Sequence, residues 1–324
     1  MRALITGVTG QDGLAIAELL TARGDEVYGL VRWVSQHRTP WLESVIPGVN
    51  VTHGDLTDET SLVRALEIAQ PNVVFHLGAL ASSGQSWAQP IAMLDNNAGG
   101  TLKLLEAIRK VNPHGIRMVN ASTSEQYGYG ADGPLGVDAT FRPMNVYGAA
   151  KVFAHNAVIN YRDSFDMHVS NALMHNHVST RRNDYFVDRK ITKAAARIKM
   201  GLQSELRLGN TDAQRDWGWG PEYMEAWVKI AWRPEPGDYI LATGKSHSVQ
   251  DLVDRAFAHV GLDPARCVVR DQAFMRPTDI PVLVGDPSET ESRLGWKATV
   301  HFDEIVDRLV RHDLSLASRE AERR

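Results

Sequence analysis

Tyr147 and Lys151 are the residues whose types and spacing most directly suggest catalysis. They are four positions apart, so on an α-helix both side chains lie on the same face. An ammonium group beside a phenol favours the phenolate and therefore lowers the pKa of the phenol. A tyrosine with a lowered pKa can accept the proton of an alcohol while a hydride leaves the same carbon. The same spacing also occurs on ordinary helix surfaces, so the pair needs support from other motifs.

Small hydroxyl side chains and one carboxylate precede this pair, in the run Ser122-Thr123-Ser124-Glu125. The run follows an apolar segment that begins near residue 117, and we expect it at the end of a strand. Its hydroxyls can orient an alcohol substrate, and Glu125 adds an acid–base group of different strength. We therefore take Thr123, Ser124 and Glu125, with Tyr147 and Lys151, as the candidate catalytic residues.

A glycine-rich turn stands near the N-terminus, between an expected buried strand at residues 2–6 and an expected helix at residues 14–23. In that order, glycines let backbone N–H groups approach a pyrophosphate at the N-terminus of the helix. An ordinary glycine turn is the alternative, but strand, turn and helix together favour dinucleotide binding. We expect the cofactor to contact Gly7, Thr9, Gly10, Gln11, Asp12 and Gly13.

Arg32 follows the second expected strand, residues 26–31. Folds that bind NAD carry an acidic residue at this place for the ribose hydroxyls, whereas an arginine suits a 2′-phosphate. Arg32 therefore favours NADP, with NAD as the other possibility. The alternative is a solvated arginine at a strand end, and Trp33 follows it.

Composition excludes several classes of protein. The chain has 324 residues, of which 43% are hydrophobic and 23% charged, as in globular proteins. The net charge of −4, without a basic block, argues against a nucleic-acid partner. The single cysteine, Cys267, excludes an intrachain disulfide and fits a reducing cytosol. Because no apolar run reaches the ~20 residues needed to cross a bilayer, we expect no membrane partner and a cytoplasmic location.

Strands and helices alternate along the first half of the chain. Further strands are expected at residues 50–53, 73–77 and 168–173, and helices at 60–69, 97–111 and 146–164. Residues 35–48 read as a long loop, while 239–243 read as a strand returning to the main sheet. This alternation predicts an α/β fold with a doubly wound parallel (Rossmann) sheet.

These motifs together resemble the extended short-chain dehydrogenase/reductase family, and most closely its GDP-mannose 4,6-dehydratases. The likeness continues through residues 174–182, 186–191, 209–218 and 276–279, so it spans nearly the whole chain. It implies an NADP-binding domain of residues 1–175, to which 211–245 return. It also implies a smaller C-terminal α/β substrate domain of residues 176–210 and 246–324.

The resemblance also implies further site residues. Besides Tyr147 and Lys151, the cofactor would contact Asp55, Leu56, Leu77, Gly78, Ala79, His177 and Arg182. The sugar nucleotide would contact Ser86, Asn176, Lys190, Arg215 and Arg276. A metal is not expected, because His175 and His177 lack the further ligands that zinc requires.

The implied reaction is dehydration of a GDP-hexose, GDP-mannose first of all, to the GDP-4-keto-6-deoxyhexose with recycled NADP. Tyr147 would take the 4-hydroxyl proton, Glu125 the proton on C5, and water would leave from C6. Thr123 would hydrogen-bond the 4-oxygen, and Lys151 would hold the nicotinamide ribose. The alternatives are an epimerase or reductase, a dehydratase of another nucleotide sugar, and a non-catalytic regulator that senses NADP.

Two segments depart from the mannose enzymes on the sugar side. Residues 80–83 read Leu-Ala-Ser-Ser where those enzymes have Gln-Ser-His-Val, and Val178 replaces a glutamate. Because a buried site that loses polar partners discriminates against hydroxyls, the pocket is expected to be less polar or reshaped around another sugar. The other interpretation is sequence drift with mannose retained.

A homo-oligomer is the expected assembly. The helices expected at residues 97–111 and 146–164 match those that pair into a four-helix bundle in this family. The segment 35–48, with Arg38, resembles one that reaches a neighbour's cofactor in tetramers. The resemblance therefore implies a homodimer or a homotetramer.

Overall fold

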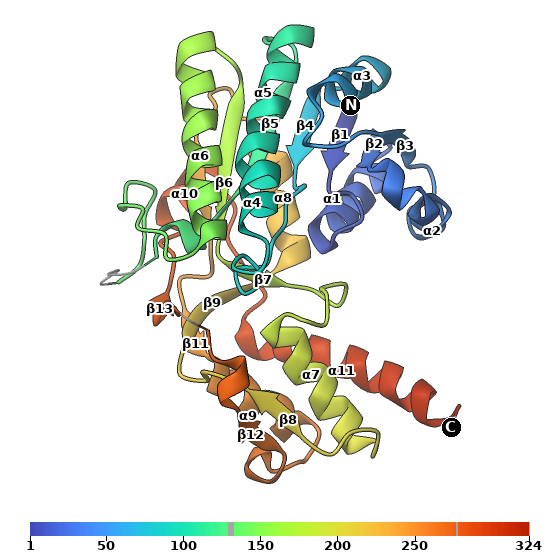
Figure 1. The fold of residues 1–324 in the computed structure, drawn as a ribbon, viewed down its shortest axis with the longest axis vertical. Helices are drawn as coiled ribbons and strands as arrows, with labels where there is room; N and C mark the ends of the chain where they lie inside the picture. Colours follow the sequence, from blue (N-terminus) through green and yellow to red (C-terminus); the bar gives the residue numbers. More distant parts are fainter. Residues whose placement is uncertain (129–132, 277, 324) are drawn as a thin grey trace.

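A computed structural model of the chain describes residues 1–128, 133–276 and 278–323, shown as a ribbon in Figure 1. The main sheet has seven strands in the order β10-β6-β5-β4-β1-β2-β3, and every neighbouring pair is parallel. The strand order changes direction between β1 and β4, which is where such folds bind ligands. The strands are β1 (Arg2–Thr6), β2 (Glu26–Val31), β3 (Asn50–His53), β4 (Val73–His76), β5 (Arg117–Thr123), β6 (Val169–Met174) and β10 (Asp238–Leu241).

Helices cover both faces of this sheet, as the prediction of a doubly wound fold requires. One face packs against α1 (Gln11–Ala22) and α8 (Gly220–Ala231). The other face packs against α3 (Glu59–Ala69), α5 (Gly100–Val111) and α6 (Val146–Phe165). Because both faces are buried, β1 and β4 are nearly continuous apolar runs, and neighbouring residues of β1 such as Leu4 and Ile5 enter opposite cores.

A smaller body lies beyond the carboxyl ends of the main strands, in the lower half of Figure 1. Its central strand is β9 (Gln214–Trp219), which pairs with β7 (Asn176–Val178), β11 (Ser246–Ser248) and β13 (Val282–Leu283). A second ladder joins β8 (Leu206–Leu208) to β12 (Val268–Arg270). The helices of this body are α7 (Val187–Lys199), α9 (Val249–His259) and α11 (Phe302–Ala321).

A buried ion pair holds α7 against α11. Arg189 donates two hydrogen bonds to the Asp313 carboxylate, at 2.8 and 2.5 Å, and Thr192 donates a third at 2.7 Å. Buried charges are stable only when paired in this way, so the contact sets the position of α7. That helix carries Lys190, one of the expected substrate-binding residues.

The structure contradicts the expectation of a loop at residues 35–48. A 3₁₀-helix, η1 (Trp33–Arg38), is followed by α2 (Thr39–Val45). Leu42 of α2 and Ile46 after it are buried in the core that α1 and α8 share. Tertiary burial of these two side chains stabilises a helix too short to show a clear period in sequence.

The helix expected at residues 97–111 begins earlier than the sequence indicates. It starts as α4 (Pro90–Leu94), continues as a π-helical turn, η2 (Asp95–Gly99), and becomes α5 at Gly100. Single π-turns of this kind are frequent at functional sites. The strand expected at residues 239–243 is confirmed, because β10 pairs with β6 in the main sheet. The remaining short helices are η3 (Ser124–Gln126), η4 (Pro264–Arg266), η5 (Gln272–Phe274) and α10 (Ser288–Leu294).

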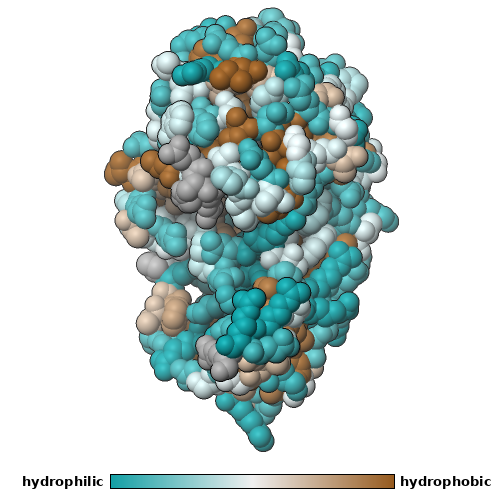
Figure 2. Space-filling model, turned by 90° about the vertical axis from the view of Figure 1, so that its right-hand side faces the viewer, coloured by the Kyte–Doolittle hydropathy of each residue, from teal (hydrophilic) through white to brown (hydrophobic). Residues whose placement is uncertain are grey.

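The surface differs between the two halves. On the face shown in Figure 2, hydrophobic side chains gather over the upper half, which contains the main sheet, and the lower half is mostly hydrophilic. Among the described residues, no helix combines the length and apolar character needed to pass through a bilayer.

Candidate active site

The candidate catalytic residues meet at the carboxyl end of β5. Thr123 ends this strand, Ser124 and Glu125 form the short helix η3, and Tyr147 and Lys151 occupy the first turns of α6. All five line one cavity of about 410 Å³. The structure therefore brings together residues that lie up to 28 positions apart in the sequence (151 − 123).

Tyr147 is buried, and its surroundings act on its acidity in opposite directions. Burial raises the pKa of the phenol, a hydrogen bond with Thr123 lowers it and the Glu125 carboxylate raises it, and the resulting pKa is about 12. The expectation of a lowered phenol pKa does not hold for the protein alone. Desolvation outweighs the hydrogen bond here, so Tyr147 keeps its proton near neutral pH.

Lys151 does not direct its charge at the phenol. Its ammonium donates a hydrogen bond of 2.8 Å to the carbonyl oxygen of Ala121 on β5. Burial lowers the pKa of Lys151 to about 8. A lysine with this pKa is partly neutral in mildly alkaline solution, so Lys151 is itself a group that titrates in the working range of most enzymes.

Asn145 organises the other half of the cluster, and sequence analysis did not identify it. Its side-chain oxygen accepts a hydrogen bond from the backbone N–H of Gly148 at 2.8 Å and caps α6. Its amide nitrogen donates to the Glu125 carboxylate at 2.9 Å. An asparagine two residues before Tyr147, at the start of an expected helix, was the available sign of such a cap.

A larger cavity of about 1070 Å³ lies beside the first, above the glycine-rich turn. Gly7 has a φ of +72°, and a Cβ placed there would lie 2.8 Å from the backbone nitrogen of Gly78. A Cβ on Gly13 would lie 2.2 Å from the Gly7 carbonyl oxygen. The turn therefore needs glycine at both positions, and it presents backbone N–H groups at the start of α1 as a pyrophosphate requires.

Most of the expected cofactor-binding residues line these two cavities. The larger one is lined by Gly7, Thr9, Gly10, Gln11, Asp12, Gly13, Arg32, Leu56, Leu77, Gly78, Ala79 and Arg182. His177 lines the smaller cavity, which shares Asp12, Leu77, Ala79 and Arg182 with the larger. Asp55 lines neither, because its carboxylate accepts hydrogen bonds from the backbone and hydroxyl of Thr57, at 2.9 and 2.8 Å.

Asp12 and His177 join the glycine-rich turn to the smaller body. The His177 ring nitrogen Nε2 lies 3.0 Å from the Asp12 carboxylate. Burial lowers the pKa of His177, but the charge and hydrogen bond of Asp12 outweigh that effect, so the pKa is raised. Sequence analysis placed each residue near the cofactor without predicting that the two are paired.

The expected substrate-binding cations converge on the smaller cavity. Lys190, Arg215 and Arg276 all line it, together with Asn176. Lys190 lies over the Phe274 ring at 3.7 Å, and Arg215 forms an ion pair with Asp279 at 3.1 Å. Ser86 lies outside, since it is fully buried and donates to the Ser83 carbonyl oxygen at 2.7 Å.

The sugar-side departures lie in two different places. Ala81, Ser82 and Ser83 line the smaller cavity, as the expectation of a changed pocket assumes. Val178 instead packs into an apolar cluster with Val300, Ile305 and Leu309. The valine that stands here in place of a glutamate therefore does not line this cavity. Sequence analysis also missed several lining side chains that carry no recognisable motif: Gln85, Tyr185, Leu208 and Phe274.

His175 lines the smaller cavity without forming part of a metal site. Neither of its ring nitrogens has a hydrogen-bond partner among the described residues. Burial lowers the pKa of His175 to about 4, so its ring is neutral near pH 7. Within the described ranges, no group of three or more histidine, cysteine or acidic side chains is arranged to hold a metal ion.

The geometry of the turn leads to a binding prediction. Gly13→Ala should weaken binding of a nicotinamide dinucleotide at least ~10-fold, which corresponds to ~1.4 kcal/mol, because the new methyl group would push the Gly7 carbonyl out of the turn. Fluorescence titration with NADP and with NAD measures the effect. Gly136→Ala is the matched control, since no atom lies within 4 Å of a Cβ at that position. Equal affinities in the two variants would contradict this account of the turn.

Comparison with known proteins agrees with this geometry. A family model described as GDP-mannose 4,6 dehydratase matches residues 4–309. GDP-mannose 4,6 dehydratase 1 of Arabidopsis thaliana is 39% identical over 98% of this chain and 91% of its own length. GDP-mannose 4,6-dehydratase of Sinorhizobium fredii (strain HH103) is also 39% identical, over 97% of this chain and 96% of its own.

Solved structures share the fold across the same length. UDP-glucose 4-epimerase of Thermus thermophilus, solved in complex with NAD, superimposes with a TM-score of 0.84 at 26% identity. The superposition covers 97% of this chain and 99% of the epimerase. The family match and the two dehydratase relatives, each aligned over nearly the full chain, place this protein in the GDP-mannose 4,6-dehydratase family, a family of hydro-lyase enzymes.

Proposed function

We propose that this enzyme removes water from a GDP-hexose, with GDP-mannose as the first candidate, and forms the GDP-4-keto-6-deoxyhexose. The observation that carries the proposal is the placement of Glu125 beside Tyr147 in one cavity with three cations. An alcohol dehydrogenase needs only the tyrosine, whereas elimination also needs a base for a carbon-bound proton. The carboxylate that Asn145 holds is suited to that second role.

The chain's own groups account for the proton transfers. Tyr147 accepts the proton of the sugar 4-hydroxyl, while Thr123 hydrogen-bonds the same oxygen. Glu125 then removes the proton on C5, which the 4-ketone makes acidic, and passes it to the C6 hydroxyl, which leaves as water. The proton that Tyr147 accepted returns to C5 once C6 has been reduced. When bound, the nicotinamide dinucleotide supplies a hydride acceptor at C4 and a donor at C6. Its oxidised ring also carries a positive charge, which is what a phenol with a pKa of about 12 needs beside it.

The substrate cations favour a nucleoside diphosphate sugar. Lys190, Arg215 and Arg276 come from three different segments of the smaller body and line one cavity. A diphosphate requires converging positive charges of this kind, and arginines bind it with two hydrogen bonds each. Asn176 and Arg215 lie on the paired strands β7 and β9, so both are held on a rigid element.

Replacement of Glu125 tests the function most directly. With a panel of GDP-mannose, other GDP-hexoses and GDP-heptoses, the wild-type protein should release a product lighter by one water in mass spectrometry. Glu125→Gln should oxidise C4 but stall before elimination, lowering product formation by ~10²–10⁴-fold. Absorbance of bound reduced cofactor should then appear with substrate and persist.

Tyr147→Phe is the paired variant, because it should prevent even the first oxidation and give no reduced cofactor. An unchanged product rate in Glu125→Gln would contradict the proposed role of the carboxylate. The same panel settles the sugar. If another GDP-sugar exceeds GDP-mannose in kcat/KM, the exchange at Ala81, Ser82 and Ser83 has reshaped the pocket.

We propose NADP as the preferred cofactor, on the basis of Arg32. This exposed arginine follows β2 and lines the larger cavity together with Ser35. Trp33 does not add a second contact there, because its ring stacks on His53 with centroids 4.3 Å apart. Arg32 is therefore the cation next to β2 that we expect to attract a 2′-phosphate.

Arg32→Asp should reverse the preference between NADP and NAD. The new carboxylate repels a 2′-phosphate and accepts hydrogen bonds from a ribose diol. The ratio of the two dissociation constants should change by at least ~10-fold, equivalent to ~1.4 kcal/mol. Isothermal titration with each cofactor measures it. A ratio that stays constant would show that Arg32 is a solvated strand-end residue.

We further propose a homodimer formed through α4 and α6. Ile91 and Leu94 of α4 and Phe153 of α6 are 69%, 47% and 49% exposed, which is unusual for large apolar side chains on packed helices. Light scattering should give twice the chain mass of 35.9 kDa. Phe153→Glu should shift the protein toward the monomer, and a monomeric wild-type protein at micromolar concentration would contradict the proposal.

A further inference from the structure

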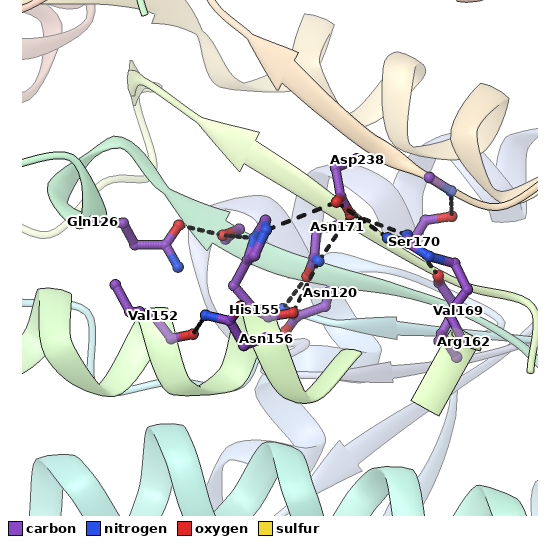
Figure 3. Close-up of polar contacts among 12 residues, drawn as sticks. Asn120, Gln126, Val152, His155, Asn156, Arg162, Val169, Ser170, Asn171 and Asp238 are labelled. Atoms are coloured by element: carbon purple, nitrogen blue, oxygen red, sulfur yellow. Dashed lines mark hydrogen bonds and ion pairs between the residues drawn. The ribbon is translucent and has the colours of Figure 1, made fainter. Parts of the chain in front are cut away.

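A buried polar network joins α6 to the strands β5, β6 and β10 (Figure 3). Its inner members are Ser122 on β5, Gln126 in η3 and His155 on α6, each at most 3% exposed. Its outer members are Asn171 on β6 and Asp238 on β10. None of these groups has a role in the proposed proton transfers.

The inner bonds form a directed chain that ends at Lys151. The Lys151 carbonyl oxygen can only accept, so Gln126 donates to it through its amide nitrogen, at 2.5 Å. The amide oxygen of Gln126 then accepts from the Ser122 hydroxyl at 2.6 Å. A hydroxyl has one proton to donate, so the contact of 3.0 Å between Ser122 and His155 Nδ1 requires the proton on Nδ1. The chain thus selects one tautomer of His155.

On the far side of the imidazole, the Asp238 carboxylate, 3.8 Å from Nε2, is too distant to form a hydrogen bond with a proton on that nitrogen. That carboxylate already accepts bonds from Arg162, at 3.1 and 3.2 Å, and from Asn171 at 2.9 Å. Burial lowers the pKa of His155, Asp238 raises it and Arg162 lowers it, with a lowered pKa as the result. The Phe141 ring lies edge-on to the imidazole, with ring centroids 5.0 Å apart.

The network joins the two segments that carry the catalytic groups. Gln126 directly follows Glu125, and the carbonyl that it holds belongs to Lys151, one helical turn after Tyr147. Without a donor at His155, the Ser122 hydroxyl is free to rotate away from Gln126. The amide would then lose its orientation, and its bond to the Lys151 carbonyl, which together with the Asn145 contact joins η3 to α6, would be weakened.

We propose that His155 is a positioning residue, whose Nδ1–H sets Ser122 and Gln126 and thereby holds Lys151 in register with Glu125. The kinetic part of this inference rests on the proposed dehydratase function. The structural part of the inference does not rest on that function, since it concerns only the environment of the Lys151 ammonium in the protein without ligands.

Two substitutions at His155 separate the effect of its hydrogen-bond donor from the effect of its side-chain volume. His155→Asn places an amide N–H near the position of Nδ1, whereas His155→Leu keeps a side chain of similar size without a donor. We expect His155→Leu to lower kcat by ~10–100-fold, as misplacement by about 1 Å does in other active sites, with KM within twofold. His155→Asn should keep kcat within threefold. Asn156→Ala is the control, since Asn156 lies next on α6 and its side chain donates to the Val152 carbonyl oxygen of the same helix, at 2.9 Å.

A second readout follows Lys151 itself without substrate or cofactor. In protein with isotopically labelled lysine, NMR titration should show the Lys151 signal, assigned with Lys151→Met, near its lowered pKa of about 8. His155→Leu should move this pKa upward, toward the ordinary value of 10.5. Should His155→Leu fail to fold, Gln126→Met removes the bond to Lys151 directly and should give the same shift.

The outcomes are distinct. If His155→Leu and His155→Asn lower kcat equally and leave the pKa of Lys151 unchanged, His155 only fills space and the inference is wrong. The proposal is supported if the pKa of Lys151 rises in His155→Leu and in Gln126→Met but not in His155→Asn. If the wild-type protein dehydrates no GDP-sugar but the shift occurs, the proposed function fails and the positioning role stands.

Discussion

One side-chain amide determines the relation between the two acid–base groups of the site. Asn145 caps α6 through Gly148 and at the same time holds the Glu125 carboxylate, at 2.8 and 2.9 Å. The Asn145 amide therefore fixes two things at once. It sets the start of the helix that carries Tyr147, and it orients Glu125, which would remove the proton on C5. Since the cap also satisfies a helix N–H that would otherwise lack a partner, catalytic geometry and helix stability depend on the same contact.

Burial is the second condition under which this site works. The protein raises the pKa of Tyr147 to about 12 and lowers that of Lys151 to about 8, in both cases mainly by desolvation. Each shift disfavours the charged form of the group. The phenol of the protein alone is thus neutral. A positive charge placed beside it, in a site shielded from water, would strongly lower its proton affinity.

Sequence predicted the parts of this enzyme that depend on local pattern. The strand, glycine turn and helix at the N-terminus, the pair Tyr147 and Lys151 on one helix face, and the late return of β10 were all visible in residue order. The pKa of Tyr147 could not be predicted from residue order, because it depends on how deeply the folded chain buries the phenol. The cavity-lining residues Tyr185 and Phe274 were also missed, since nothing in their neighbours marks them as cavity residues. Val178 was misplaced because a strand residue can face either of two sides, and only its packing against Val300 and Leu309 decides which.

The position of β10 at one edge of the main sheet has a consequence for how the protein is made. Residues 238–241 pair with β6, and α8, just before them, covers the sheet face that α1 also covers. A ribosome therefore synthesises all the glycine-rich and catalytic motifs before the sheet that supports them can close. Until then the edge of β6 and an apolar face of the sheet stay open, and such edges pair readily with other chains. Fragments that end after α7 contain every catalytic residue yet lack the strand and helix that complete their support, and aggregation rather than residual activity is their expected fate.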